Sequence, residues 1–313
     1  MDPSQQLFIE HLGPIEPIFV IDILLIAVAL FGMGLNILLL CIACLRKTQR
    51  WAIDALFIVA IALFDFVVSM SVAVSLGIRF WLGEQVWDAQ GAWCKFTAIG
   101  ISGGTVITLG FTACLAVARY LALVRGKQLN TRAWLGGAVA VMSGLLGFTI
   151  ERGLNGMSFV LPSGFYCTPQ YYGDDLVTVW FGMYTGLVFI SAVVLIPFCY
   201  IQISLHYSQV ITTMWDIGHL AIRRRLRRNT AYLVIVLGGY SLSIFPEFLH
   251  IFISMVFKVT RTSLSDGIVM LLISCLTLIN PTFALLLHDE CRLEFMAVLR
   301  IVKRRSITIQ LFK

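Results

Sequence analysis

The chain has 313 residues, of which 59% are apolar and only 13% are charged, and its mean hydropathy is +0.89. A water-soluble domain carries about 25% charged residues, so most of this surface must face lipid. The formal net charge of +6 gathers on one expected face of the membrane and therefore argues against a nucleic-acid partner.

Seven long apolar runs follow one another along the chain. A membrane-spanning helix needs about 20 predominantly apolar residues. The expected spans cover residues 18–44, 53–79, 92–123, 134–150, 176–206, 229–257 and 264–287. The sequence therefore predicts an all-α membrane protein: an N-terminal segment (1–17), a seven-transmembrane helix bundle (18–288), and a short amphipathic helix with a tail (289–313).

The basic residues indicate how the bundle is oriented. Short loops that are rich in Lys and Arg stay on the cytoplasmic side of a membrane. Of the 23 Lys and Arg residues, 18 fall in one alternate set of segments, and only Arg79, Lys95, Arg152, Lys258 and Arg261 fall in the other. This asymmetry predicts a plasma-membrane protein with its N-terminus outside and its C-terminus in the cytoplasm.

The cysteines give a second indication of the same orientation. Six of the eight lie in spans or on the inner side, and only Cys94 and Cys167 reach the oxidising outer side. We therefore predict one disulfide between these two residues. It would join the outer end of the third span to the loop after the fourth.

Three carboxylates fall inside apolar runs: Asp22, Asp65 and Glu247. Ionisable groups within a membrane are costly, so they mark functional positions by default. Asp65 lies in mid-membrane and should face the bundle interior. Its expected donors, at matching depth, are Asn36, Thr108 and Asn280. Glu247 follows Pro246, which kinks the helix, so it can line a cavity. Asp22 is near the outer end of its helix and can simply reach water.

Residues 289–300 follow the seventh span and read as an amphipathic helix along the inner surface. Phe295, Leu299 and Val302 form an apolar stripe, and the flanking basic residues suit anionic lipid headgroups. Membrane lipids are thus an expected partner. Cys291 is positioned either for palmitoylation or as a free thiol.

One landmark in each span resembles the rhodopsin-like (class A) G protein-coupled receptors. The landmarks are Asn36, Asp65, Cys94 with Arg119-Tyr120, Trp134, Pro197, Pro246, and Asn280-Pro281. The resemblance covers nearly the whole chain, and it includes the 25-residue interval from Cys94 to Arg119. It implies a receptor that signals to a heterotrimeric G protein and is not an enzyme.

The resemblance also implies roles for individual residues. Coupling to the G protein would use Arg119, Tyr120, Arg223, Arg224 and Arg225. Activation and the polar core would use Asn36, Asp65, Thr108, Pro246, Asn280 and Pro281, and Asp65 is also a candidate sodium ligand. Arg119 has a simpler alternative role as an anchor that reaches the interface, and the basic run has one as a topology signal.

By position, the resemblance also implies a ligand pocket in the outer half of the bundle. Its lining would be Ile101, Ser102, Thr105, Phe189, Glu247, Phe248, Met270 and Ser274. A conventional opsin is excluded because Ser274 stands where the retinal-binding lysine would be, so no cofactor is expected. Ile101 replaces the acid that anchors biogenic amines, which argues against an aminergic receptor. The ligand is expected to be extracellular or membrane-derived.

Several switch residues of the family are replaced in this chain. Ala118 stands where an acid usually precedes Arg119, and Leu226 offers no carboxylate from the sixth span. The other replacements are Ile244, Ala284 and Leu205. The missing acid predicts a loosely held resting state. Together the departures indicate either a divergent branch of the family or a receptor with biased or absent coupling.

Two other classes of protein remain as alternatives. A seven-helix channel or transporter usually carries internal repeats or several charges along one path, and neither is seen here. A membrane enzyme would need a clustered site, whereas the five His residues are scattered without metal-ligand spacing. A receptor that binds a ligand without coupling is the third alternative.

Overall fold

The computed structural model describes residues 15–45, 53–82, 91–127, 130–156, 158–171, 175–213, 220–257 and 262–287. Seven helical segments within these ranges are long and apolar enough to cross a membrane. The predicted fold class is therefore confirmed. The expected amphipathic helix at 289–300, Cys291, and nearly all of the N-terminal segment lie outside the described residues.

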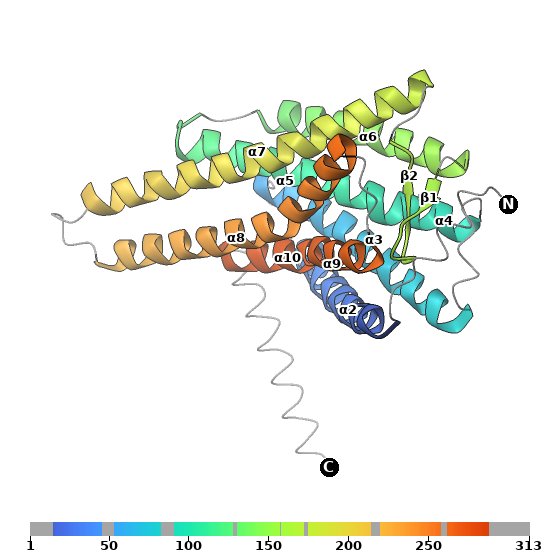
Figure 1. Cartoon of the computed structure of the whole chain (residues 1–313). Helices are drawn as coiled ribbons and strands as arrows, with labels where there is room; N and C mark the ends of the chain where they lie inside the picture. The colour runs from blue at the N-terminus through green and yellow to red at the C-terminus, as the bar shows by residue number, and fades with distance from the viewer. Residues whose placement is uncertain are drawn as a thin grey trace, which may run out of the picture.

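Single helices form five of the spans: α2 (Ile15–Leu45), α3 (Ile53–Leu82), α6 (Thr131–Leu154), α7 (Leu176–Thr213) and α8 (Leu220–Phe257). The helices run side by side, and α7 and α8 project beyond the others at one end (Figure 1). Both are longer than predicted, because each continues past its apolar run into polar sequence.

The third span has three consecutive parts: α4 (Ala92–Thr97), the π-helical turn η2 (Ala98–Gly103) and α5 (Gly104–Leu123). Glycine lets its neighbours approach closely here. A Cβ atom on Gly100 would lie 2.2 Å from the Ser71 hydroxyl of α3, and one on Gly103 would lie 2.7 Å from Thr149 of α6. The third span therefore packs closely against both α3 and α6 at these two glycines. Such π turns are often found at functional sites.

The seventh span consists of α9 (Ser263–Ser274) and α10 (Leu276–Leu287), with Cys275 between them. We predicted one continuous helix, and the interruption has a local cause. The Thr277 hydroxyl donates to the Ser274 carbonyl at 2.8 Å. Pro281, four residues after Thr277, has no N–H to donate, so the Thr277 carbonyl is left free for another partner.

A short hairpin covers the end of the bundle where Cys94 lies, and we call this the disulfide end. Its strands are β1 (Ser158–Val160) and β2 (Cys167–Pro169), which pair antiparallel with Phe159 opposite Thr168. The opposite end, where Arg119 lies, is the arginine end. The sequence did not predict the hairpin, since three-residue strands leave no periodic pattern.

The chain after β2 lies against the first turns of α7. The Tyr171 ring stacks on Phe181 with centroids 5.3 Å apart. A Cβ atom on Gly182 would lie only 2.2 Å from the Tyr171 carbonyl oxygen, whereas one on Gly186 would meet nothing within 4 Å. Only glycine therefore fits at position 182.

This contrast predicts opposite effects of one substitution at two neighbouring glycines. Gly182→Ala should lower the melting temperature, because the clash is with backbone and cannot be relieved by a rotamer change. Gly186→Ala, one turn further along α7, should leave it unchanged or raise it, since alanine favours helix by roughly 1 kcal/mol over glycine. Thermal unfolding in detergent measures both. Equal shifts for the two variants would contradict the contact.

Candidate functional site

A chain of polar side chains joins three spans in the middle of the bundle. Asp65 of α3 is only 1% exposed. Its Oδ2 accepts a hydrogen bond of 2.7 Å from Asn280 Nδ2 of α10. The Tyr240 hydroxyl of α8 donates in turn to Asn280 Oδ1. Asn280 is thus confirmed as a donor to Asp65. Thr108 interacts with the carboxylate electrostatically, but its hydroxyl makes no hydrogen bond within the described residues.

Asn36 does not donate to Asp65, so this part of the prediction is wrong. Its Nδ2 donates to the Gly32 carbonyl at 2.8 Å and to the Thr277 carbonyl at 3.0 Å. The second acceptor is the carbonyl that Pro281 leaves without a helical partner. The carbonyl freed by Pro281 thus accepts the Asn36 amide that we expected to bond to Asp65. This hydrogen bond joins α2 to α10.

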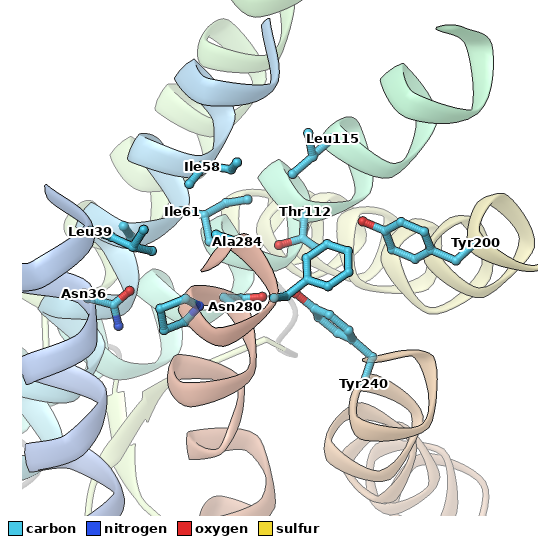
Figure 2. Close-up of a pocket in the computed structure, with 13 residues that line it drawn as sticks. Asn36, Leu39, Ile58, Ile61, Thr112, Leu115, Tyr200, Tyr240, Asn280 and Ala284 are labelled. Atoms are coloured by element: carbon cyan, nitrogen blue, oxygen red, sulfur yellow. The ribbon is translucent and has the colours of Figure 1, made fainter. Parts of the chain in front are cut away.

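A small cavity adjoins this polar chain on the arginine side, with a volume of about 20 Å³. The residues around it include Asn36, Ile61, Thr112, Tyr200 and Asn280. Tyr200 and Tyr240 reach toward it from two neighbouring helices (Figure 2). Asn36 Oδ1 has no hydrogen-bond donor among the described residues. A space of this size accommodates about one water molecule, which could supply that donor.

Sodium at Asp65 stays a prediction. The described residues contain no group of three or more His, Cys, Asp and Glu side chains that could hold a metal ion. The oxygen atoms of Asp65 and Thr108 are nevertheless of the hard type that alkali and alkaline-earth cations take.

Arg119 lies at the arginine end of the third span and is 7% exposed. Its Nε donates to Asp54 Oδ2 of α3 at 3.1 Å, and its guanidinium carbon lies 5.1 Å from the centroid of the Phe283 ring. The missing acid at position 118 led us to expect no adjacent restraint, but the arginine has a carboxylate partner from another helix. Sequence reasoning missed Asp54, although an acid at the end of a neighbouring span was a usable signal.

Tyr120 packs beside Arg119 without joining its ion pair. Its ring meets Phe198 of α7 edge to face, with centroids 5.8 Å apart. Its hydroxyl accepts from Arg125 Nε at 3.0 Å. Tyr120 thus links the end of the third span to the fifth.

The basic run lies on the projecting part of α8. Arg224, Arg227 and Arg228 are exposed there. The side chains of Arg223 and Arg225 lie outside the described part of the structure. The exposed arginines are separate from the Arg119–Asp54 pair but belong to the same end of the bundle.

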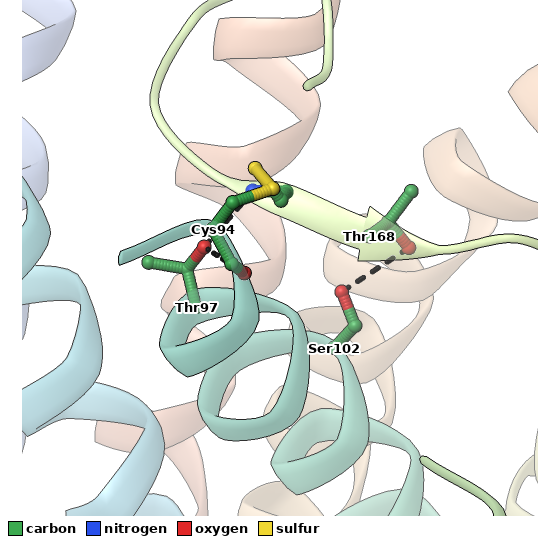
Figure 3. The surroundings of a disulfide bond; sticks show 5 residues. Cys94, Thr97, Ser102 and Thr168 are labelled. Atoms are coloured by element: carbon green, nitrogen blue, oxygen red, sulfur yellow. Dashed lines mark hydrogen bonds between the residues drawn. A yellow bond between two sulfur atoms is a disulfide. The ribbon is translucent and has the colours of Figure 1, made fainter. Parts of the chain in front are cut away.

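The predicted pocket residues pack in more than one cluster, and the pocket itself stays a prediction. Ile101 and Met270 are buried together with Leu161 and Phe165 of the hairpin loop. Ser102 instead turns to β2, where its hydroxyl donates to Thr168 Oγ1 at 3.3 Å (Figure 3). Phe189 packs in a different cluster of α5, α7 and α8. The remaining members are half-buried Thr105, Glu247 and Phe248 and buried Ser274.

The loop between β1 and β2 enters the disulfide end among three helices. Ser163 Oγ and its backbone N–H donate to Asp266 of α9, at 2.5 and 3.2 Å. Arg79 of α3 donates to the Ser163 carbonyl at 3.2 Å and lies 4.7 Å from the centroid of the Phe165 ring. Arg79 also pairs with Asp22 of α2 at 3.7 Å. Asp22 is therefore 4% exposed and does not simply reach water.

The predicted disulfide is confirmed between Cys94 of α4 and Cys167 of β2, whose Cα atoms are 5.1 Å apart. Thr97 supports it from the next turn. Its hydroxyl donates to the Cys94 carbonyl at 3.1 Å and accepts from the Cys167 N–H at 3.0 Å (Figure 3). The hairpin is thus attached to the third span by the disulfide, by Thr97 and by the hydrogen bond between Ser102 and Thr168.

A second set of polar contacts at the disulfide end joins α6 to the start of α7. Asp175 accepts from the Thr178 hydroxyl and backbone N–H at 2.5 and 2.9 Å, in the manner of a helix N-cap. It also pairs with Arg152 of α6 at 2.9 Å. The Thr178 bonds first, and then Arg152, lower the pKa of the Asp175 carboxyl from 3.8 to about 2.

This lowered pKa gives a pH prediction. A carboxyl whose folded pKa lies below its unfolded value contributes stability above the unfolded pKa, near 3.8, and loses it as the pH falls toward about 2. Asp175→Ala should therefore lower the melting temperature at pH 7 and pH 5 equally, and the difference from wild type should shrink below pH 4. Asp175→Asn, which keeps the cap without the charge, should shift less. A difference that already shrinks between pH 7 and pH 5 would contradict the assignment.

The fold and this site define a class: a multi-pass membrane protein whose seven helical spans enclose a polar core above a buried arginine. The family model for the 7 transmembrane receptor (rhodopsin family) matches residues 35–283, which is most of the chain. The chain therefore belongs to the rhodopsin family of seven-transmembrane receptors.

Two similar proteins illustrate the relationship. Human oxoeicosanoid receptor 1 is 26% identical over 131 residues, a stretch that covers 42% of this chain but only 32% of that receptor. The crystal structure of squid rhodopsin superposes with a TM-score of 0.65, covering 93% of this chain and 87% of the rhodopsin. At 15% sequence identity, the second similarity concerns the fold alone.

Proposed function

We propose that this protein is a G protein-coupled receptor that binds an extracellular or membrane-derived ligand in the disulfide-end half of the bundle. It signals to a heterotrimeric G protein at the arginine end and is not an enzyme. The observation that carries the proposal is Arg119, a charged side chain buried at the mouth of a seven-helix bundle and paired with the partly exposed carboxylate of Asp54. A charge that is buried yet weakly held is suited to exchanging partners.

The orientation belongs to the same proposal. Arg79, Lys95 and Arg152 are the described basic residues at the disulfide end, whereas the arginine end carries more than twice as many. A disulfide also belongs on the oxidising side of a plasma membrane. These two observations support an extracellular disulfide end and a cytoplasmic arginine end. Anionic lipid headgroups are then the expected contacts of the exposed arginines on α8.

The ligand is proposed to be largely apolar. Ile101 and Met270 are buried in the disulfide-end half, and one relative is by name a receptor for oxoeicosanoids, which are lipids. Ile101 offers no counter-ion to a biogenic amine. Ser274 offers no amine for a retinal linkage, so we propose that the receptor works without a bound chromophore.

Nucleotide exchange on a panel of purified Gα subunits tests the function. Receptor in lipid vesicles should accelerate exchange on at least one subunit, alone or with a panel of fatty acids and oxidised fatty acids. Arg119→Ala should reduce that rate by about tenfold or more, since a charged hydrogen-bond partner is worth about 1.5–3 kcal/mol. Arg132→Ala, an exposed arginine at the same end, is the matched control and should behave as wild type.

Two outcomes would contradict the proposal. Exchange that is equally fast in Arg119→Ala would remove Arg119 from coupling. No response from any subunit would leave a receptor without coupling, or a seven-helix channel or transporter.

A further inference from the structure

Arg119 is the charged group at the arginine end that most needs a counter-charge. Its side chain is 8% exposed, so it carries a full positive charge where little water reaches it. A buried charge without a partner is strongly destabilising. Neither its neighbour Ala118 nor Leu226 of α8 can supply a carboxylate. The partner must come from another part of the bundle.

Asp54 supplies that carboxylate from the neighbouring helix α3. It lies in the first turn of α3, 65 residues before Arg119, and its Oδ2 accepts from Arg119 Nε at 3.1 Å. Among the described residues it is the one acidic side chain at the arginine end. Phe283 of α10 supports the guanidinium from its aromatic face, and Tyr200 of α7 interacts with it electrostatically. Four spans therefore meet at this arginine.

We infer that Asp54 is the positioning residue that holds Arg119 in the resting state, in place of the acid missing at position 118. The inference rests on the proposed coupling function and specifies how that site is regulated. A coupling partner must break the Arg119–Asp54 pair and offer the guanidinium acceptors of its own. The Arg119–Asp54 ion pair, which we call the lock, joins α5 to α3. Relative movement of these two helices therefore breaks it.

Solvent exposure of Asp54 limits the strength of the Arg119–Asp54 lock. The Asp54 side chain is 31% exposed and makes one contact with Arg119 through a single oxygen. Partly exposed ion pairs are weak, so loss of Asp54 should raise basal exchange by about two- to fivefold rather than by orders of magnitude. The pair is suited to being broken by a binding partner.

A purely structural role would give different results. An acid in the first turn of a helix stabilises the helix dipole, so Asp54 could serve α3 alone. In that case Asp54→Asn would lower the melting temperature without changing basal exchange. It would also act independently of Arg119.

The experiment compares basal exchange on the responding Gα subunit for four variants. Asp54→Asn should raise it, and Asp54→Glu should keep it near wild type. Asp54→Asn combined with Ala118→Asp should return it to within about twofold of wild type, because the carboxylate is restored beside Arg119. Glu151→Gln removes an acid from an arginine pair at the disulfide end and is the control, expected to match wild type.

A second measurement does not depend on a G protein. Melting temperatures of Asp54→Asn, Arg119→Gln and the double variant form a double-mutant cycle, which should be non-additive if the two side chains interact. If wild type couples through Arg119 but Asp54→Asn leaves basal exchange unchanged, the inference fails and the function stands. If no subunit responds to wild type, the proposed function fails. In that case, additive changes in melting temperature would also contradict the Arg119–Asp54 lock. Non-additive changes would support the lock independently of G protein coupling.

Discussion

Cys94→Ser is expected to remove most of the receptor from the cell surface. The disulfide is the covalent attachment of the β1–β2 hairpin to the third span, and it joins residues 73 positions apart. Loss of a native disulfide typically costs about 2–5 kcal/mol and often prevents folding at body temperature. Surface staining relative to total protein measures the effect.

The control for this variant is Cys44→Ser, because Cys44 is a free, exposed cysteine of α2. It should reach the surface like wild type. Wild-type protein that is alkylated without reduction should also run faster on a gel than reduced protein. Identical mobility before and after reduction, or normal surface levels of Cys94→Ser, would contradict the structural role of the bond.

Asn280→Ala is expected to cause the second largest loss, in stability and in coupling together. The variant takes the amide donor from the buried Asp65 carboxylate and the acceptor from the Tyr240 hydroxyl. Leaving buried polar groups unpaired costs about 1–3 kcal/mol each, and more for a charged one. The melting temperature and the exchange rate should therefore both fall.

Ser69→Ala is the matched control for this prediction. Ser69 is buried one helical turn from Asp65, and its hydroxyl has no partner among the described residues. Its removal should change the melting temperature little. If Asn280→Ala were as mild as Ser69→Ala, the chain from Asp65 to Tyr240 would not stabilise the bundle.

The spans and the disulfide could be predicted because their signals are local or compositional. A run of about 20 apolar residues identifies a span wherever its neighbours lie. Only two cysteines fall on the expected outer side, so Cys94 and Cys167 could be paired without knowing the fold.

The side-chain partners were harder to predict because they depend on which way each helix faces. Depth alone suggested that Asn36 would donate to Asp65, but the carbonyl freed by Pro281 takes its amide. Ala118 and Leu226 suggested that Arg119 lacked the acidic restraint usual in the family, while Asp54 reaches it from 65 residues away. The hydrogen bond from Ser102 to Thr168 was not foreseen either, because the three-residue strands of the hairpin leave no periodic signal.

If a ligand binds in the disulfide-end half of the bundle, as we propose, the loop that enters between α2, α3 and α9 affects how fast that ligand can arrive. Ser163 and Phe165 are held there by Asp266 and Arg79, so a molecule diffusing in from water at this point must first displace them. Association through this route is then limited by the opening rate of the loop. A lipophilic molecule that instead enters sideways between helices would bind at a rate set by its concentration in the bilayer, and the same closed loop would lengthen its residence time.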